Sequence, residues 1–442
     1  MLLRLLAIIV FMPLCAVATG CRCPSARCCV PGTPCAVCAL ELATVDGEPP
    51  DLVQGADSDS KADLLPLPAP SETYQLLDAA TCQCNAATNA SVANMVELER
   101  HWARIVMECD SKGVRKNLCL DRDLLALHAT GIRNTAAASA LEAFYQLAGL
   151  EAQKHYLQRG IEETERTLKR LDEFRQKGLA IPKGVDRSSV ALRLRTLQDQ
   201  KLQLDFLRIQ LNGQLQKLMG CSLDEFAFYW PQADWQPDLT PVDVQGELTQ
   251  GLANRTDLRG LSLVICRLEK QTLPVGRAVL KFADGTVGSV EPIDGWIHVA
   301  RCFRCNKSEL PVRRRQLAIF YHDTELAATA EIKSAAYKIT LQQQRVRVAQ
   351  QKVQELRDRL QELTEARNVQ DIAIFEISKV RVQTYEAESD LVRQVVGLQV
   401  ARVGLRKAQG TLAQECGFSP VLCCEGKCDG ARTPCSDKTC SK

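Results

Sequence analysis

The sequence predicts a mainly α-helical protein built from two long antiparallel coiled-coil hairpins in tandem. Four long segments carry apolar residues at heptad spacing, which places a narrow apolar seam along each helix and favours packing against a neighbour. A short interruption of the heptad phase separates the segments of each pair, as expected for a turn. Only 5% of the residues are aromatic, which suits long helices better than a sheet sandwich.

Residues 1–20 are predicted to be a signal peptide. Arg4 precedes an apolar stretch at 5–14, which is too short to span a membrane, and small residues follow it. Cleavage could follow Ala18. Alternatively, residues 18–21 resemble a lipobox, in which Cys21 would be a lipid anchor, or Cys21 is simply the first disulfide cysteine. We therefore expect the chain in the cell envelope, in the periplasm or at the outer membrane, with lipid anchoring as one alternative.

Cysteines are concentrated at both ends of the mature chain. Of the 21 cysteines in the chain, six crowd the start of an N-terminal region at 21–73 and five lie in a Cys-rich tail at 417–442. The first region continues as a linker rich in Pro, Asp and Ser. In an exported chain this density favours disulfides over reduced thiols. Cys302 and Cys305 have metal-ligand spacing, and the clusters could hold copper or zinc, but disulfides explain them better, and we expect no metal or cofactor.

Residues 74–221 form the first predicted repeat, an approach helix followed by a helical hairpin. The turn of this hairpin lies at 178–184, where Gly and Pro end one helix and Asp186 or Ser188 can cap the next. The apolar heptad rows of its two arms are Leu147, Ile161 and Leu168; Leu150, Leu157 and Leu171; and Val190, Leu197, Leu204, Leu211 and Leu218.

Residues 244–416 form the second predicted repeat, after a linker at 222–243 that is rich in Pro, Trp and Asp. Two neighbouring rows each hold one polar residue in register, Gln342 in one and Gln394 in the other. A turn is predicted at 365–371, with arms of roughly 45 residues and ~65–70 Å. The clearest rows are Ile332, Ile339, Val346, Val353 and Leu360; and Ile377, Leu391, Leu398, Leu405 and Leu412. The chain is therefore interpreted as an internal duplication.

A short β insertion is predicted at about 276–305, inside the second repeat. Residues 278–283 and 286–290 are joined by Asp284-Gly285 and are interpreted as a small hairpin. Residues 296–300 could add a third short strand.

Three motifs resemble the TolC-like outer-membrane efflux family. Residues 254–258, Asn-Arg-Thr-Asp-Leu, resemble the opening of the family's second repeat, with Thr256 in place of its usual Pro. Residues 211–220 resemble the end of its first hairpin, and residues 174–179 with Asp186 resemble its hairpin tip. The resemblance covers about 74–416. The chain departs from the family at the sites where each repeat normally carries membrane-spanning strands, because residues 107–119 are too few and too charged for two such strands. The resemblance therefore implies the fold of a TolC-like α-barrel protomer with little or no β-barrel.

The resemblance implies a function in efflux or export. It implies a homotrimer whose hairpins form a helical tunnel across the periplasm, working with a periplasmic adaptor and an inner-membrane transporter at the outer membrane. The hairpin tips would contact the adaptor through Gly178, Leu179, Asp186, Asn368 and Asp371.

Other functions remain as alternatives. A non-conducting coiled-coil structural lipoprotein would keep the fold and lose the membrane pore. A pump adaptor would carry one hairpin rather than two, and a metal-binding envelope protein would use the cysteine clusters. The net charge of +2 and the absence of a basic stripe argue against a nucleic-acid partner. No nucleophile motif, phosphate loop or catalytic residue is found, so we do not expect an enzyme.

Overall fold

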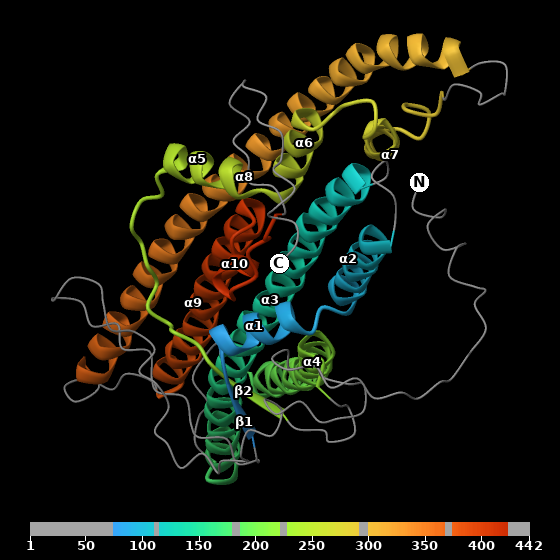
Figure 1. Cartoon of the computed structure of the whole chain (residues 1–442). Coiled ribbons are helices and arrows are strands. Elements are labelled where there is room, and N and C mark those ends of the chain that lie inside the picture. The colour runs from blue at the N-terminus through green and yellow to red at the C-terminus, as the bar shows by residue number, and fades with distance from the viewer. Residues whose placement is uncertain are drawn as a thin grey trace, which may run out of the picture. The chain divides into compact units, whose positions relative to one another are not determined.

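A computed structural model describes residues 74–109, 115–178, 186–221, 228–290, 299–366 and 374–422 (Figure 1). These residues all belong to one compact unit, residues 40–442. The predicted signal peptide, Cys21, the linker before residue 74 and the cysteines after Cys416 lie outside the described residues.

The described elements follow the predicted duplication. The first repeat contains β1 (Tyr74–Asp78), α1 (Ala79–Thr88), α2 (Ser91–Cys109), α3 (Arg115–Gln176) and α4 (Arg187–Met219). Strand β2 (Phe228–Gln232) lies between the repeats. The second repeat contains α5 (Val244–Asn254), α6 (Thr256–Cys266), α7 (Leu273–Ala283), α8 (Val299–Ala366), α9 (Ile374–Gln409) and α10 (Leu412–Glu415). The predicted mainly α-helical class is confirmed.

The arms of each hairpin are unequal in length, whereas similar arms were expected for the second one. Helix α3 has 62 residues and its partner α4 has 33, while α8 has 68 and α9 has 36. The long helix of each repeat continues past its partner and packs against shorter helices there, α2 in the first repeat and α6 and α7 in the second. The additional residues of α3 and α8 thus pack against these shorter helices rather than against the partner arm.

The four long helices form a row in the order α8, α9, α3 and α4, as their contacts and Figure 1 show. The predicted heptad row of α8 lies in the core, with Ile332, Ile339, Val346 and Val353 each at most 2% exposed. Gln342 Nε2 donates to Gln394 Oε1 at 3.0 Å and to the Gln394 carbonyl at 2.9 Å. Each of these two polar residues interrupts an apolar row of its own helix, and the two satisfy one another across the α8–α9 interface.

A two-stranded parallel sheet occupies part of the predicted linker at 222–243. Strand β1 pairs with β2, with Tyr74 opposite Phe228. The side chain of Asn212 on α4 accepts a hydrogen bond from the Tyr229 backbone at 2.7 Å, and Arg208 donates to the Tyr74 hydroxyl at 2.7 Å. Part of the predicted linker therefore forms a strand, because its aromatic residues pair with β1 and a helix offers polar anchors.

The prediction of a β insertion is wrong for its described part, because residues 273–283 form helix α7. Its buried residues include Leu273, Gly276 and Leu280, whose spacing is helical, and short apolar runs are ambiguous between strand and helix. Residues 284–290 form a turn in which the Asp284 carboxylate accepts from the Thr286 backbone at 2.8 Å. Of the proposed third strand, residues 299 and 300 lie in α8 and the remainder lies outside the described residues.

An ion pair fixes α7 against α8. Arg277 donates to both oxygens of Glu309 at 2.7 and 2.8 Å, and Arg313 donates to the same carboxylate at 2.8 Å. The hydrogen bonds from Arg277, which have the largest effect, and from Arg313 lower the pKa of Glu309 to about 2. No helix among the described residues has both the length and the apolar character needed to cross a bilayer.

Candidate functional site

The predicted tip of the first hairpin lies between α3 and α4. Gly178 has a φ of +65°, which ends α3 in the left-handed region that glycine tolerates. Asp186 caps α4 by accepting from the backbones of Ser188 and Ser189, each at 3.2 Å. The hydrogen bond from the Ser188 side chain, followed by these backbone bonds, lowers the pKa of Asp186. Leu179, and both predicted residues of the second tip, Asn368 and Asp371, lie outside the described residues.

The two hairpins lie side by side near their tips. The Phe174 ring on α3 meets the Phe375 ring on α9 edge-on, with centroids 5.6 Å apart. A groove of about 570 Å³ runs between α3, α4 and α9, and an ion pair between Arg193 and Glu386 crosses from α4 to α9. Further from the tip, Glu163 on α3 accepts from Ser378 at 2.6 Å on α9. The described ends of α3, α4 and α9 next to the tips are thus in contact with one another.

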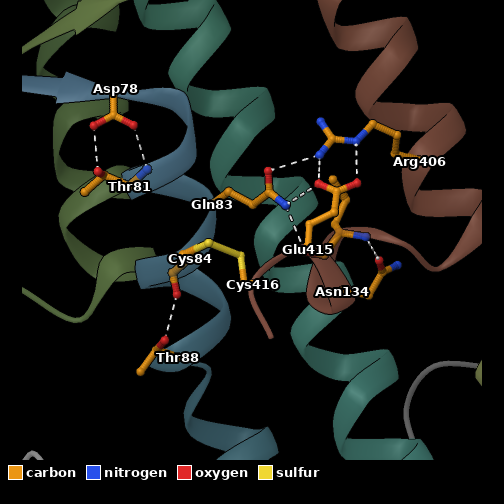
Figure 2. Close-up of a disulfide and its surroundings, with 10 residues drawn as sticks. Asp78, Thr81, Gln83, Cys84, Thr88, Asn134, Arg406, Glu415 and Cys416 are labelled. Carbon is orange, nitrogen blue, oxygen red and sulfur yellow. Dashed lines mark hydrogen bonds and ion pairs between the residues drawn. A yellow bond between two sulfur atoms is a disulfide. The ribbon is translucent and has the colours of Figure 1, made fainter. Parts of the chain in front are cut away.

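A disulfide joins the beginning of the first repeat to the end of the second (Figure 2). Cys84 on α1 is bonded to Cys416, which follows α10, and the two residues are 332 positions apart. Gln83 donates to the Leu412 carbonyl at 2.8 Å and to Glu415 at 2.9 Å beside it. Cys221 and Cys266 are also disulfide-bonded. The expectation that cysteines of this chain form disulfides is therefore met at these positions.

A free thiol lies two residues before the disulfide. Cys82 is fully buried and donates to the Ala140 carbonyl at a sulfur–oxygen distance of 3.5 Å. Burial raises the pKa of this thiol to about 12. Because the thiolate is the species that attacks disulfides, this raised pKa disfavours attack by Cys82 on the neighbouring bond.

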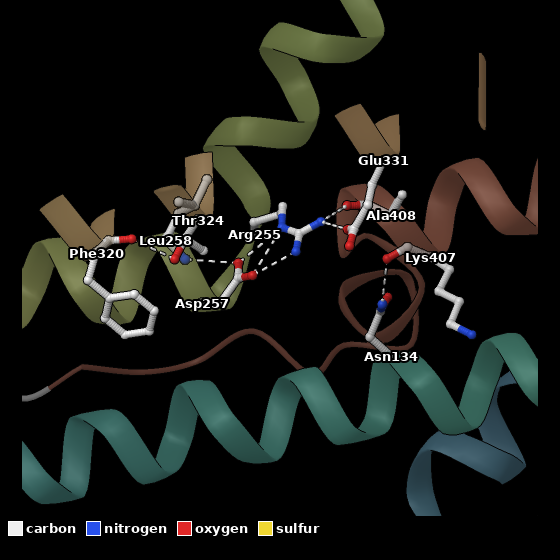
Figure 3. A network of polar contacts seen from close by, with 9 residues as sticks. All are labelled: Asn134, Arg255, Asp257, Leu258, Phe320, Thr324, Glu331, Lys407 and Ala408. Carbon is white, nitrogen blue, oxygen red and sulfur yellow. Dashed lines mark hydrogen bonds and ion pairs between the residues drawn. The ribbon is translucent and has the colours of Figure 1, made fainter. Parts of the chain in front are cut away.

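The Asn-Arg-x-Asp-Leu motif forms a polar network between α5 and α6 (Figure 3). Arg255 donates to both oxygens of Asp257, at 2.7 Å from Nη2, and also reaches Glu331 on α8 and the Ala408 carbonyl on α9. Burial alone would raise the pKa of Asp257, but the hydrogen bonds and charge of Arg255 outweigh it and lower the pKa. The motif therefore fixes the start of α6 against the second hairpin, and its role in this chain is positional.

The row of long helices has two exposed edges. Among the described residues, α4 and α8 share no extensive contact, so each has only one long neighbour in the row. Both edges expose large apolar side chains, and α2 adds a third set. These residues are Leu192, Leu202, Phe206 and Ile209 on α4; Val312, Ile319, Leu326, Leu341 and Val348 on α8; and Met95, Leu98 and Trp102 on α2.

The apolar residues of the two edges occupy matching levels along the row. One level is defined by the pair of Gln342 with Gln394, the contact of Gly149 with Val396, and the ion pair of Glu151 with Arg208. These contacts place Leu341 on α8 at about the same height along the helix axes as Phe206 and Ile209 on α4. A second level starts at Glu331 on α8, which pairs with Arg255. Arg255 also donates to the Ala408 carbonyl on α9, and Asn134 on α3 donates to the adjacent Lys407 carbonyl. Arg133, next to Asn134, donates to Asn94 on α2, so Leu326 on α8 lies near the level of Met95 and Leu98 on α2.

Two features were missed by the sequence reasoning. The Cys84–Cys416 bond had a signal, since each cysteine lies near an outer boundary of the duplication, but spacing alone cannot assign partners. The exposed row of α8 also had one: Val312, Ile319 and Leu326 are seven residues apart, as are Leu341 and Val348. That row was overlooked because the buried row on the other face of the helix is longer.

No group of three or more metal-ligating side chains is found within the described part of the chain. The side chains of Cys302 and Cys305 lie outside the described residues.

Comparisons with known proteins identify the fold. No family model and no curated protein matches the sequence. The outer-membrane channel OprN is 14% identical with a TM-score of 0.56, over 75% of this chain and 90% of that one. The open-state MtrE outer-membrane channel of Neisseria gonorrhoeae is 11% identical with a TM-score of 0.55, over 75% and 88%. The CusC channel is 13% identical with a TM-score of 0.50, over 75% and 95%.

At such identities the similarity establishes the fold alone. The chain has the fold of TolC-like outer-membrane channels, which confirms, at the level of the fold, the resemblance that the sequence motifs predicted.

Proposed function

We propose that this chain is a TolC-like envelope protein that acts in efflux or export. It assembles as a homotrimer whose six hairpins form a helical tunnel across the periplasm. The tips, including Gly178, Leu179, Asp186, Asn368 and Asp371, contact a periplasmic adaptor of an inner-membrane transporter. The tunnel conducts substrate and performs no covalent chemistry.

The observation that carries this proposal is the open row of helices with two apolar edges. An exposed stripe of large apolar side chains on a long helix favours burial against a partner. The two edges are different surfaces, so joining the α8 edge of one copy to the α4 edge of the next is a heterologous contact. Such contacts close into a ring when the rotation between copies is a simple fraction of a full turn, as in a trimer, and otherwise form a filament. The matching levels of Leu341 on α8 and Phe206 on α4 support such a contact without a shift along the helix axis. At the second level Leu326 of α8 is matched by Met95 of α2, which packs against α3.

Photo-crosslinking tests this arrangement. Benzoylphenylalanine in place of Leu341 is expected to crosslink to α4 of another copy, near Phe206, and the native mass is expected to be that of a trimer. The same probe in place of Ile339, which is buried within the hairpin, should crosslink only within its own chain. Crosslinks from α8 to α8, or a monomeric mass, would refute the ring.

The alternative is a structural lipoprotein that kept the fold and lost the membrane pore. It is favoured by the short connection between α2 and α3, which consists of residues 110–114. Five extended residues reach at most ~18 Å, which is less than one crossing of the ~30 Å hydrocarbon layer.

Conductance separates these two functions. Single-channel steps from the purified trimer in a planar bilayer would support efflux or export. A trimer without conductance would instead support the structural lipoprotein.

A further inference from the structure

A large apolar groove opens between the shorter helices at the end of the row opposite the hairpin tips. It measures about 1160 Å³ and is bounded by α2, α3, α6 and α7. Its walls are mostly aliphatic and include Leu125 on α3, Leu261 on α6 and Val279 on α7. The volume is sufficient for a drug-sized molecule.

Two exposed aromatic rings line the groove. Trp102 on α2 is 57% exposed, and Phe282 on α7 is 87% exposed. The face of an aromatic ring attracts cations, and tryptophan does so most strongly.

The charged groups of the groove have one sign. Its described lining contains the carboxylates of Glu99, Asp121 and Asp257, together with His128, and no Lys or Arg. Asp257 is paired with Arg255, so its charge is already balanced. Neither Glu99 nor Asp121 makes a hydrogen bond or ion pair through its side chain with any described residue.

The environment of Asp121 is unfavourable for an isolated negative charge. Asp121 is half-buried among Leu118, Leu124 and Leu125, and this burial raises the pKa of its carboxyl group. A positive charge placed in the groove would offset the desolvation and stabilise the ionised carboxylate.

We propose that this groove is a binding site for small lipophilic cations, with its aliphatic walls burying the apolar body and Asp121, Glu99 and Trp102 attracting the charge. The two carboxylates favour this occupant over a lipid acyl chain, which carries no positive charge to offset theirs. A second copy of the protein is the other occupant, and the comparison of protomer with oligomer below separates it from the cation. The proposal that the bound cation is an exported substrate rests on the proposed function. The proposal that the groove binds cations does not.

Titration calorimetry with a pair of ions tests the proposal on the full mature chain in detergent. Tetraphenylphosphonium and tetraphenylborate have nearly the same size and opposite charge. Tetraphenylphosphonium is expected to bind and tetraphenylborate to bind much more weakly, each after subtraction of its partition into the detergent. Equal binding of the two ions, or a preference for the anion, would overturn the proposal.

Variants locate the binding in the groove. Asp121→Asn should weaken tetraphenylphosphonium binding roughly tenfold, equivalent to about 1.4 kcal/mol. Ala278→Lys places an ammonium group at the exposed wall of α7 and should abolish the binding of the cation. Glu355→Gln removes an exposed carboxylate of α8 that does not line the groove, and it should leave the affinity unchanged. Unchanged melting temperatures confirm that each variant is folded, and wild-type affinity in Asp121→Asn would refute the assignment.

Two further outcomes are distinguishable. If the dissociated protomer binds the cation and the assembled oligomer does not, the groove is an interface between copies and the proposal fails. Crosslinking between α8 and α4 does not involve the groove, so it reports on the trimer whether or not the cation binds.

Discussion

At the scale of single residues, buried polar side chains set the register of the hairpins. Gln342 and Gln394 face one another inside an otherwise apolar seam, and Gly397 leaves space for the Gln342 side chain, since a Cβ there would lie 2.5 Å from its Nε2. This pair, of which Gln342 is buried and Gln394 half-buried, is satisfied in one register only, because a shift of one heptad would place each amide against an aliphatic row.

Replacing one member of this pair should be more harmful than replacing both. Gln342→Leu leaves the Gln394 amide without its partner and should lower the free energy of unfolding by about 1–2 kcal/mol. The double variant with Gln394→Leu should recover most of this loss. Urea denaturation of the single and double variants measures the coupling. Additive losses would show that the two amides do not depend on one another.

The Glu309 carboxylate gives a pH-dependent contribution to stability. Its folded-state pKa of about 2 lies below its ordinary value of 4.5, so the contribution is complete above pH 4.5 and is lost as the pH falls toward 2. Glu309→Gln should therefore destabilise the protein at pH 6, with a difference from wild type that shrinks between pH 4.5 and 3. Denaturation at several pH values measures this difference. Glu355→Gln, which removes an exposed carboxylate, should show no such trend.

At the scale of elements, close helix contacts and one covalent bond join the two repeats. Helix α3 packs along α9, which makes the first hairpin and the second hairpin one unit. The Cys84–Cys416 bond then connects α1 to the end of α10, where Arg133 also lies 4.5 Å from the centroid of the Phe418 ring. The two repeats are thus fixed to one another both through the core and at their outer ends.

The contact between α3 and α9 can be tested at a glycine. A Cβ on Gly149 would lie 2.5 Å from a methyl group of Val396. Valine has few allowed side-chain rotamers in a helix, so this methyl group cannot easily move away. Gly149→Ala should therefore lower the free energy of unfolding by about 1–3 kcal/mol, as overpacking does. Gly404→Ala on α9, where no atom lies within 4 Å, should raise it by up to about 1 kcal/mol through helix propensity. Thermal or urea unfolding compares the two, and equal effects would argue against the close approach.

Removal of the disulfide should destabilise the protein where α1 of the first repeat meets the end of the second repeat. Cys84→Ser with Cys416→Ser should lower the free energy of unfolding by about 2–5 kcal/mol, because the bond restricts a long loop of the unfolded chain. Hydrogen exchange should rise in residues 411–422, while the core of α9 keeps its protection. Cys84→Ser alone serves as the matched comparison, since either change removes the same bond. An unchanged unfolding curve would mean that the noncovalent contacts of α10 are sufficient.

At the scale of the whole molecule, the row of helices is open at α4 and α8 and presents large apolar side chains at both edges. In the monomer these apolar side chains remain in contact with water, which disfavours the isolated chain. The same edges would be buried in the proposed ring, where each copy covers one edge of its neighbour.

Charged substitutions at either edge should dissociate the assembly without unfolding the chain. Leu341→Glu on α8 and Phe206→Glu on α4 should each convert the trimer to monomer, because burying an unpaired carboxylate costs several kcal/mol. Val290→Glu, at an exposed position after α7, should leave the trimer intact. Native mass measurement with circular dichroism checks assembly and folding together. A trimer that survives both edge variants would exclude these edges as the interface.

The sequence by itself determined the mainly helical class, the duplication and the heptad seams. These follow from local periodicity, which is present in the chain whatever its partners are. It also indicated the turn at 178–184, a cap at Asp186 or Ser188, and one polar residue in an apolar row of each arm of the second hairpin, Gln342 and Gln394.

Only the tertiary structure decided which segments meet across long separations. It paired Cys84 with Cys416, placed β1 beside β2 and showed that residues 273–283 form a helix, because each outcome depends on contacts between segments far apart in the chain. The groove beside Asp121 and the exposed edges of α4 and α8 likewise arise from the packing of several helices. Local periodicity specifies which face of a helix is apolar, but the packing of the other helices decides which apolar face remains uncovered.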